Sequence, residues 1–343
     1  MHGARIEGHH VAGLVALFEA CAIRPEETVA VLSETGSRPI NVETATLALA
    51  QIGAKPFHLV AQTPKMGAMI VRSTGASQVL TGAPPLVEAL KAADVVIDLT
   101  LEGLMHAPQT AEILKAGTRI QVISDEHPDI LARFSPDPAL KEAVRAGARK
   151  AREASRMTVT SAAGSDLSVD MGGAATVGVW GWTDRPGTLA HWPGGIVVSF
   201  PRAGTVSGRL VLSPGDMNLT YKRYIEAPVT LTLADDHVVA VEGEGVDAKL
   251  MRDTWDAWND PAARAVSHVG WGLNREARWD ALTMVDRKDT NGTELRAVPG
   301  NFLFSTGANE FAGRFTEGHF DLPMMGCTIA LDGTPVAIDG RLL

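Results

Sequence analysis

The first 124 residues alternate helical patterns with strand-like patterns, and this alternation restricts the fold more than any other feature of the sequence. Apolar residues at helical spacing, such as Leu14, Leu17 and Phe18, precede short apolar runs that are typical of buried strands. Such an alternation predicts a parallel sheet with helical crossovers. The expected helices span residues 11–21, 41–52, 86–93 and 111–115, and the expected strands span residues 28–32, 56–60, 94–99 and 117–124.

Two further features describe the helices of this region. Asn41 is expected to cap the start of the helix over residues 41–52, and Gly53 is expected to end it. A charged helix over residues 138–155 ends the region, and we interpret it as a solvated helix that links two domains.

From Met157 onward, glycines and short alternating apolar runs dominate, which indicates a β-rich region with one helix over residues 245–258. We therefore predict two domains. An α/β N-terminal domain with a mostly parallel sheet spans residues 1–156, and a β-rich α+β domain that carries the metal site spans residues 157–343. The expected strands of the second domain are residues 158–160, 196–200, 208–212, 229–233 and 238–241.

Composition excludes several classes of function. The net charge of -9 and the absence of a basic stripe argue against nucleic-acid binding. No apolar run approaches the roughly 18 residues of a membrane span, and the N-terminus lacks the pattern of a signal peptide. Only two cysteines are present, Cys21 and Cys327, so we expect a cytoplasmic protein without a disulfide framework, in which Cys327 is a small buried thiol.

Glycine motifs of common enzyme classes are also absent. Gly172-Gly173 and Gly194-Gly195 lack the strand-to-helix context of a dinucleotide or phosphate loop, and no Gly-x-Ser-x-Gly elbow occurs. This argues against a nicotinamide, flavin or serine-nucleophile enzyme.

His319 and Asp321 carry the sharpest chemical signal. Residues two apart in a strand point to the same side, so an imidazole and a carboxylate can reach one ion there. With a further histidine this set suits Fe(II), with open positions for O₂ and substrate, and it equally suits zinc. A pair that lies on the surface and binds nothing is the plainer alternative.

Four other residues are candidates for handling substrate. His106 follows the strand over residues 94–99, where open α/β sheets place ligands, although a surface histidine is an equal alternative. His191 stands beside a tryptophan and a tight turn, which is typical of a packed corner or a pocket wall. Ser305 and Thr306, in a small-residue stretch interpreted as a loop, are candidates for binding substrate or for turn chemistry.

Four stretches together resemble the 2,5-dihydroxypyridine 5,6-dioxygenases, the iron enzymes of nicotinate degradation. The resemblance covers nearly the whole chain and is more specific in its second half. The stretches are His191-Trp192-Pro193-Gly194-Gly195, Ser267-His268-Val269-Gly270-Trp271-Gly272-Leu273, Gly300-Asn301-Phe302-Leu303-Phe304-Ser305-Thr306-Gly307 and His319-Phe320-Asp321.

The resemblance implies that His268, His319 and Asp321 hold Fe(II) and that His106 and His191 line the pocket and move protons. It also implies the partners and the reaction. The partners are a small aromatic N-heterocycle and O₂. The reaction opens the ring of 2,5-dihydroxypyridine to give N-formylmaleamate, with both atoms of O₂ incorporated. The protein is expected to be a homo-oligomer, either a dimer or an assembly of dimers.

More distantly, the chain resembles the thermophilic-type leucyl aminopeptidases, which are dinuclear metallo-hydrolases with the same two-domain plan. No tyrosine follows His268 through Arg278, and the strand after Gly195 lacks a glutamate, which favours one metal over two. A dinuclear hydrolase remains the alternative, because three carboxylates are available as second-site ligands; a non-catalytic metal-binding protein is a third hypothesis. These carboxylates are Asp166, Glu242 and Glu244.

Overall fold

The computed structural model of the chain describes residues 5–65, 77–123 and 125–343. The chain folds into two compact units, and each unit is built from three segments of sequence. The first unit comprises Met1–Pro138, Trp180–Gly194 and Val285–Thr293, and the second comprises Ala139–Val179, Gly195–Met284 and Glu294–Leu343.

A parallel sheet forms the centre of the first unit, which confirms the α/β part of the predicted fold. Its order is β2-β1-β3-β4-β8, and all four pairings are parallel. The chain moves outward from β1 to β2 and then returns to β3, so the order reverses between β1 and β3. Ligands of open α/β sheets bind at the carboxyl ends of the strands near such a reversal. The strands are β1 (Val29–Glu34), β2 (Phe57–Ala61), β3 (Val95–Asp98), β4 (Arg119–Ile123) and β8 (Leu189–Trp192).

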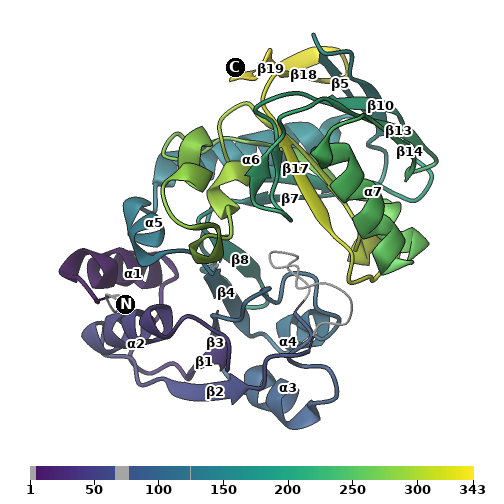
Figure 1. The fold of residues 1–343 in the computed structure, drawn as a ribbon. Helices are drawn as coiled ribbons and strands as arrows, with labels where there is room; N and C mark the ends of the chain where they lie inside the picture. Colours follow the sequence, from purple (N-terminus) through teal and green to yellow (C-terminus); the bar gives the residue numbers. More distant parts are fainter. Residues whose placement is uncertain (1–4, 66–76, 124) are drawn as a thin grey trace. The chain divides into compact units, whose positions relative to one another are not determined.

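Helices cover both faces of this sheet (Figure 1). On one side α1 (Gly8–Ala20) packs against α2 (Pro39–Gln51) and α5 (Pro128–Arg133). On the other side α3 (Pro84–Lys91) packs against α4 (Thr110–Lys115). An apolar core is buried between α3, α4 and the strands. Its largest aliphatic side chains are Leu32, Leu80, Leu90, Leu104, Ile113 and Ile120.

The start of α2 differs from the prediction. The helix begins at Pro39 with Arg38 before it, and Asn41 lies inside the first turn. Proline suits the first helical position, because an N–H at this position has no acceptor within the helix and the φ of proline is already helical. Asn41 instead donates from Nδ2 to the carbonyl oxygen of Glu126, 2.9 Å away. Its role is therefore a tertiary contact in place of a helix cap.

Antiparallel strands dominate the second unit, as the sequence predicts for its β-rich part. An eight-stranded sheet has the order β14-β13-β10-β6-β5-β18-β19-β20, and a two-stranded ribbon pairs β11 with β12. The strands of these two sheets are β5 (Arg156–Ser161), β6 (Asp166–Asp170), β10 (Val206–Leu212), β11 (Met217–Asn218), β12 (Arg223–Tyr224), β13 (Val229–Ala234), β14 (His237–Glu242), β18 (Cys327–Leu331), β19 (Thr334–Ile338) and β20 (Arg341–Leu342).

A five-stranded antiparallel sheet of order β17-β16-β15-β9-β7 carries the candidate metal ligands. Every residue of four of these strands is buried, so side chains on this sheet are shielded from water. The strands are β7 (Ala175–Val179), β9 (Ile196–Phe200), β15 (Val266–Gly272), β16 (Phe302–Thr306) and β17 (Phe320–Met324).

The second unit also contains the α-helices α6 (Pro138–Glu153), which begins at the boundary with the first unit, and α7 (Val246–Trp258). In the described ranges, 5–65, 77–123 and 125–343, no helix combines the length and the apolar character needed to cross a membrane.

Candidate metal centre and flanking histidines

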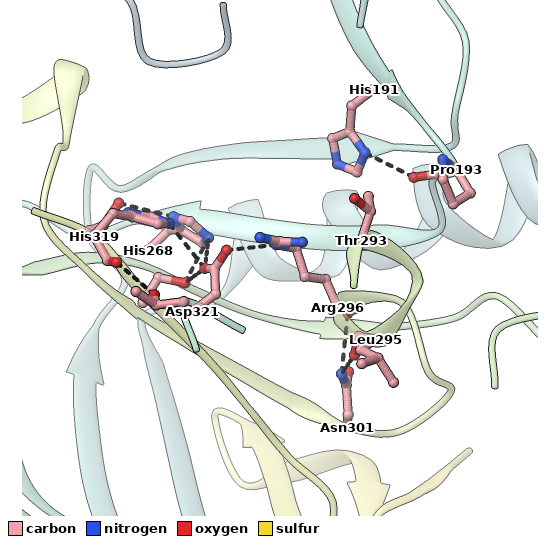
Figure 2. A network of polar contacts seen from close by, with 12 residues as sticks. His191, Pro193, His268, Thr293, Leu295, Arg296, Asn301, His319 and Asp321 are labelled. Carbon is pink, nitrogen blue, oxygen red and sulfur yellow. Dashed lines mark hydrogen bonds and ion pairs between the residues drawn. The ribbon is translucent and has the colours of Figure 1, made fainter. Parts of the chain in front are cut away.

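The three predicted metal ligands meet on the five-stranded sheet (Figure 2). His268 lies in β15, His319 directly precedes β17, and Asp321 lies within β17. The Nε2 atom of His319 is 3.2 Å from Oδ1 of Asp321, and Nε2 of His268 is 3.6 Å from the same oxygen. All three side chains are buried. The structure thus brings both imidazoles close to one oxygen of the Asp321 carboxylate.

Two features of the strands bring these side chains together. The two-residue period of a strand puts His319 and Asp321 on one side, as the sequence predicts. His268 arrives through a β-bulge, because the pairing of β15 with β16 steps from Val266 to Val269 while its partner advances only from Thr306 to Phe304. An extra residue in one strand bends it and redirects its side chains.

Ser267, the other residue in the bulge, keeps a hydrogen on Nδ1 of the His268 ring. The Ser267 hydroxyl donates its one hydrogen to the carbonyl oxygen of Ala308. Its oxygen lies 3.0 Å from Nδ1 of His268, so it accepts the hydrogen that this nitrogen carries. Ser305 gives its own hydrogen to Oδ1 of Asp321 and lies 2.9 Å from Nε2 of His268, so in this metal-free arrangement Nε2 carries a hydrogen that a metal would replace. Partners of this kind orient the histidine ligands of metal sites.

Asp321 uses its second oxygen for a buried ion pair. Nε of Arg296 lies 2.6 Å from Oδ2 of Asp321, and Arg296 is also buried. Burial alone raises the pKa of Asp321, but the positive charge of Arg296 and the nearby His319 and His268 outweigh it, so the pKa lies well below its usual range. The group is a carboxylate at neutral pH, which is the form that binds metals.

A turn held by Asn301 positions Arg296. The Asn301 side chain accepts a hydrogen bond from the backbone N–H of Gly272, 2.7 Å away. It donates from Nδ2 to the carbonyl oxygens of Leu295 and Arg296, at 2.8 and 3.2 Å. The end of β15 and the turn that carries Arg296 are thereby joined (Figure 2).

The two predicted substrate-binding residues lie in strand β16, which corrects the expectation of a loop. Ser305 is opposite Asp321 in the sheet, and its hydroxyl donates to Oδ1 of that residue and lies 2.9 Å from Nε2 of His268. Thr306 is the next residue of the strand and therefore points to the other face. Its buried Oγ1 has no hydrogen-bond partner among the described residues, so the structure does not join it to the triad.

His106 and His191 belong to the first unit. His106 lies in the turn between β3 and α4, and His191 lies in β8, so both are at the carboxyl edge of the parallel sheet. Both are buried. Nδ1 of His191 lies 2.8 Å from the carbonyl oxygen of Pro193 and donates to it, since a carbonyl only accepts (Figure 2). The lone pair of a neutral His191 is then on Nε2.

The carboxylates considered for a second metal are elsewhere in the second unit. Asp166, Glu242 and Glu244 are exposed. Asp166 lies in β6 and Glu242 in β14, which are strands of the eight-stranded sheet and not of the sheet that carries the triad. The structure therefore does not bring them together with His268, His319 and Asp321.

Sequence reasoning missed Arg296, Ser267 as a partner of His268, and the contribution of β8 to the parallel sheet. No local pattern marks the first two, because one depends on a turn and the other on a bulge. A signal for β8 was present in the apolar residues around His191, but its pairing with β4 joins Ile120 to Leu189 across a long stretch of sequence.

Comparison with known proteins agrees with this architecture. A family profile described as 2,5-dihydroxypyridine 5,6-dioxygenase matches residues 10–343. The 2,5-dihydroxypyridine 5,6-dioxygenase of Pseudomonas putida is 36% identical over 323 residues, which are 92% of this chain and 91% of that protein.

Solved structures give the same result. The structure of the 2,5-dihydroxypyridine dioxygenase from Pseudomonas putida KT2440 matches with a TM-score of 0.90 and 34% identity, over 97% of this chain and 96% of that one. AmpT from Thermus thermophilus matches with a TM-score of 0.62 and 15% identity, over 97% and 99% of the two chains, and shows a shared fold alone. The match to the family over nearly the whole chain identifies this protein as a dioxygenase of the 2,5-dihydroxypyridine 5,6-dioxygenase family.

Proposed function

We propose that this chain opens the ring of 2,5-dihydroxypyridine, or of a close hydroxypyridine, with O₂ to give N-formylmaleamate, and that His268, His319 and Asp321 hold the Fe(II) it requires. Family membership supports the reaction class. The observation that carries the site is the buried convergence of two imidazole nitrogens on Oδ1 of Asp321.

The donor set fits a single ferrous ion. Two histidines and one carboxylate on one side of a metal are the ligands of non-haem Fe(II) oxygenases, which leave positions for substrate and O₂. The two histidine nitrogens lie 3.2 and 3.6 Å from Oδ1, so all three groups face one region of the sheet. The low pKa of Asp321 gives this group the charged form that ligation needs, and the bond from Nδ1 of His268 to Ser267 leaves Nε2 as the nitrogen that would bind the metal once it loses its hydrogen.

Fe(II) held there would supply the redox chemistry that lets O₂, a triplet molecule, react with a closed-shell ring. The overall change breaks the bond between ring carbons 5 and 6 and adds one oxygen atom to each of them. Both oxygens come from O₂, so no further oxidant, reductant or water is consumed.

The protein's own part in the reaction includes moving a proton. Removal of the proton from the hydroxyl at carbon 5 enriches the ring in electrons and prepares it for oxidation. His191 suits this step, because its hydrogen bond to Pro193 leaves the Nε2 lone pair as the basic site. We assign His106, at the same edge of the parallel sheet, to binding the substrate and returning the proton. Ser305 would hold Asp321 in place from β16.

Oxygen uptake tests the proposal directly. The purified chain is loaded with Fe(II) without air, 2,5-dihydroxypyridine is added, and O₂ consumption is followed with an electrode. We expect one O₂ per ring and the appearance of N-formylmaleamate. His319→Ala should abolish uptake, whereas His237→Ala, which removes an exposed histidine from β14 of the same unit, should not change it. Absence of uptake with every hydroxylated pyridine tried, or full activity in His319→Ala, would refute the proposal.

A further inference from the structure

A second group of two histidines and one carboxylate lies far from the triad in sequence, in the first unit. His9 and His10 stand in the first turn of α1, and Asp129 stands in the first turn of α5. Nε2 of His10 is 2.6 Å from Oδ1 of Asp129, and Nε2 of His9 is 3.0 Å from the same oxygen. The three ligand atoms all lie within 4.8 Å of one another.

The arrangement repeats the donor atoms of the triad, with two Nε2 atoms directed at one Oδ1. It differs in access, since the side chains of His9 and Asp129 are 59% and 60% exposed. A cation from solution can therefore reach the group, and water can complete its coordination. The two rings are tilted by 58° with centroids 4.2 Å apart, which lets both nitrogens approach one point.

We propose that His9, His10 and Asp129 form a surface site for a late first-row divalent cation such as Zn²⁺, separate from the catalytic metal. Imidazole nitrogens with a carboxylate are ligands that zinc accepts, and oxygen-preferring ions such as Mg²⁺ or Ca²⁺ are poorly matched to two histidines. A bound ion would tie the start of α1 to the start of α5.

Binding at this site would replace the hydrogen bond between Nε2 of His10 and Oδ1 of Asp129 by bonds from both atoms to the ion, and it changes one further contact. Nδ1 of His10 accepts a hydrogen bond from the backbone N–H of Glu7, 3.1 Å away, so the hydrogen of a neutral His10 is on Nε2. A metal on Nε2 shifts that hydrogen to Nδ1 and breaks the contact with Glu7. The loss of one such hydrogen bond weakens binding by roughly fivefold. Glu7 is exposed, so its N–H can donate to water instead.

His127 is a neighbour of the site and not one of its three ligands. Its Nδ1 accepts a hydrogen bond from the backbone N–H of Asp129 at 3.2 Å and lies 3.5 Å from Oδ2 of that residue. Because this nitrogen accepts, it has no hydrogen for the carboxylate, and His127 acts as the cap of α5 that holds the backbone of Asp129.

Zinc titration by calorimetry at pH 7.5 tests the site on the full chain. The reference is His319→Ala, which removes a ligand of the proposed catalytic metal. His9→Ala is added to it to disrupt the surface site, and His58→Ala is added to a second sample as a control, because His58 is also an exposed histidine of the first unit. Thermal unfolding with excess zinc gives an independent readout, since a ligand of the native state raises Tm.

We expect one zinc per chain in the reference and in the control, with Tm raised by the ion in both. The variant with His9→Ala should bind at least tenfold more weakly and lose the rise in Tm. Binding of equal strength with and without His9, or no zinc binding in the reference, would overturn the proposal. No step depends on ring cleavage, so the result stands apart from that of the oxygen-uptake experiment.

Discussion

Arg296 and Asp321 form a buried ion pair in which Nε of the arginine lies 2.6 Å from Oδ2 of the carboxylate. The other oxygen, Oδ1, faces the two histidines. Asp321 thus divides its oxygens between a permanent cation of the protein and the position proposed for the metal. The ion pair keeps the carboxylate charged and oriented before any metal arrives, which lowers the cost of assembling the site.

Replacing Arg296 with methionine should destabilise the metal-free protein by about 3–5 kcal/mol, because it removes the guanidinium that is paired with the buried Asp321 carboxylate. Fe(II) should restore part of this loss, because the ion supplies the missing positive charge. Urea unfolding with and without Fe(II) measures both effects, and the stabilisation by Fe(II) should be larger in the variant than in the parent. Equal stabilisation in the two proteins would contradict this account.

Arg278→Met is the matched control for that experiment. Arg278 pairs with Asp280 at 2.7 Å, but both side chains are about half exposed. Exposed ion pairs contribute little, typically below about 1 kcal/mol. The control should therefore change neither the stability of the metal-free protein nor its response to Fe(II) by more than that amount.

Ser267→Ala should weaken Fe(II) binding by roughly 10–100-fold while the fold is retained, because the His268 ring loses the oxygen that holds its hydrogen on Nδ1. Activity measured against Fe(II) concentration gives the change in affinity. The control is Ser199→Ala in the neighbouring strand β9, whose buried hydroxyl hydrogen-bonds to the hydroxyl of Thr176, 2.7 Å away. A loss of affinity as large in the control would show that any buried hydroxyl of this sheet has the same effect.

Sequence periodicity was sufficient to predict that His319 and Asp321 lie together, but not to place His268. His319 and Asp321 share a face because a strand repeats every two residues, and this requires no knowledge of the rest of the fold. The place of His268 depends on a bulge in the pairing of β15 with β16, and the place of Arg296 depends on the clamp made by Asn301. Both are long-range arrangements that leave no periodic pattern.

The same distinction applies to the fold. The alternating helix and strand patterns predicted the parallel sheet, since each element has its own apolar spacing. The start of α2 was predicted wrongly from Asn41, because the helix begins two residues earlier at Pro39 and the Asn41 amide nitrogen makes a tertiary contact with Glu126. Family resemblance, and not spacing, supplied the choice of iron and the reaction.

Asp98→Asn should alter how stability depends on pH. Burial raises the pKa of Asp98 to about 6, although three hydrogen bonds from Thr100 and Leu104 oppose the shift. A raised pKa in the folded state adds stability at low pH that is lost as the pH rises through about 6. The parent should therefore lose about 2 kcal/mol more than the variant between pH 4.5 and 7.5.

Urea unfolding of both proteins at the two pH values measures this difference, and Asp253→Asn provides the comparison, because that carboxylate is exposed and paired with Lys249 on the helix surface. Identical pH dependence in the parent and in Asp98→Asn would show that burial does not keep Asp98 protonated. The asparagine should also be less stable than the parent at pH 4.5, since its amide cannot accept all three hydrogen bonds that anchor the loop toward His106.

Gly270→Ala should destabilise the sheet that carries the triad. A Cβ at this position would lie 2.0 Å from the carbonyl oxygen of Val197, and the clash is with backbone of β9, so it is relieved only by separating β15 from its neighbour. We expect a loss of about 3 kcal/mol in urea unfolding, together with weaker Fe(II) binding because His268 is two residues away in the same strand. Gly326→Ala, where a Cβ would meet nothing within 4 Å, should stay within about 0.5 kcal/mol of the parent. Equal stability of the two variants would mean that β15 and β9 do not approach as closely as this register requires.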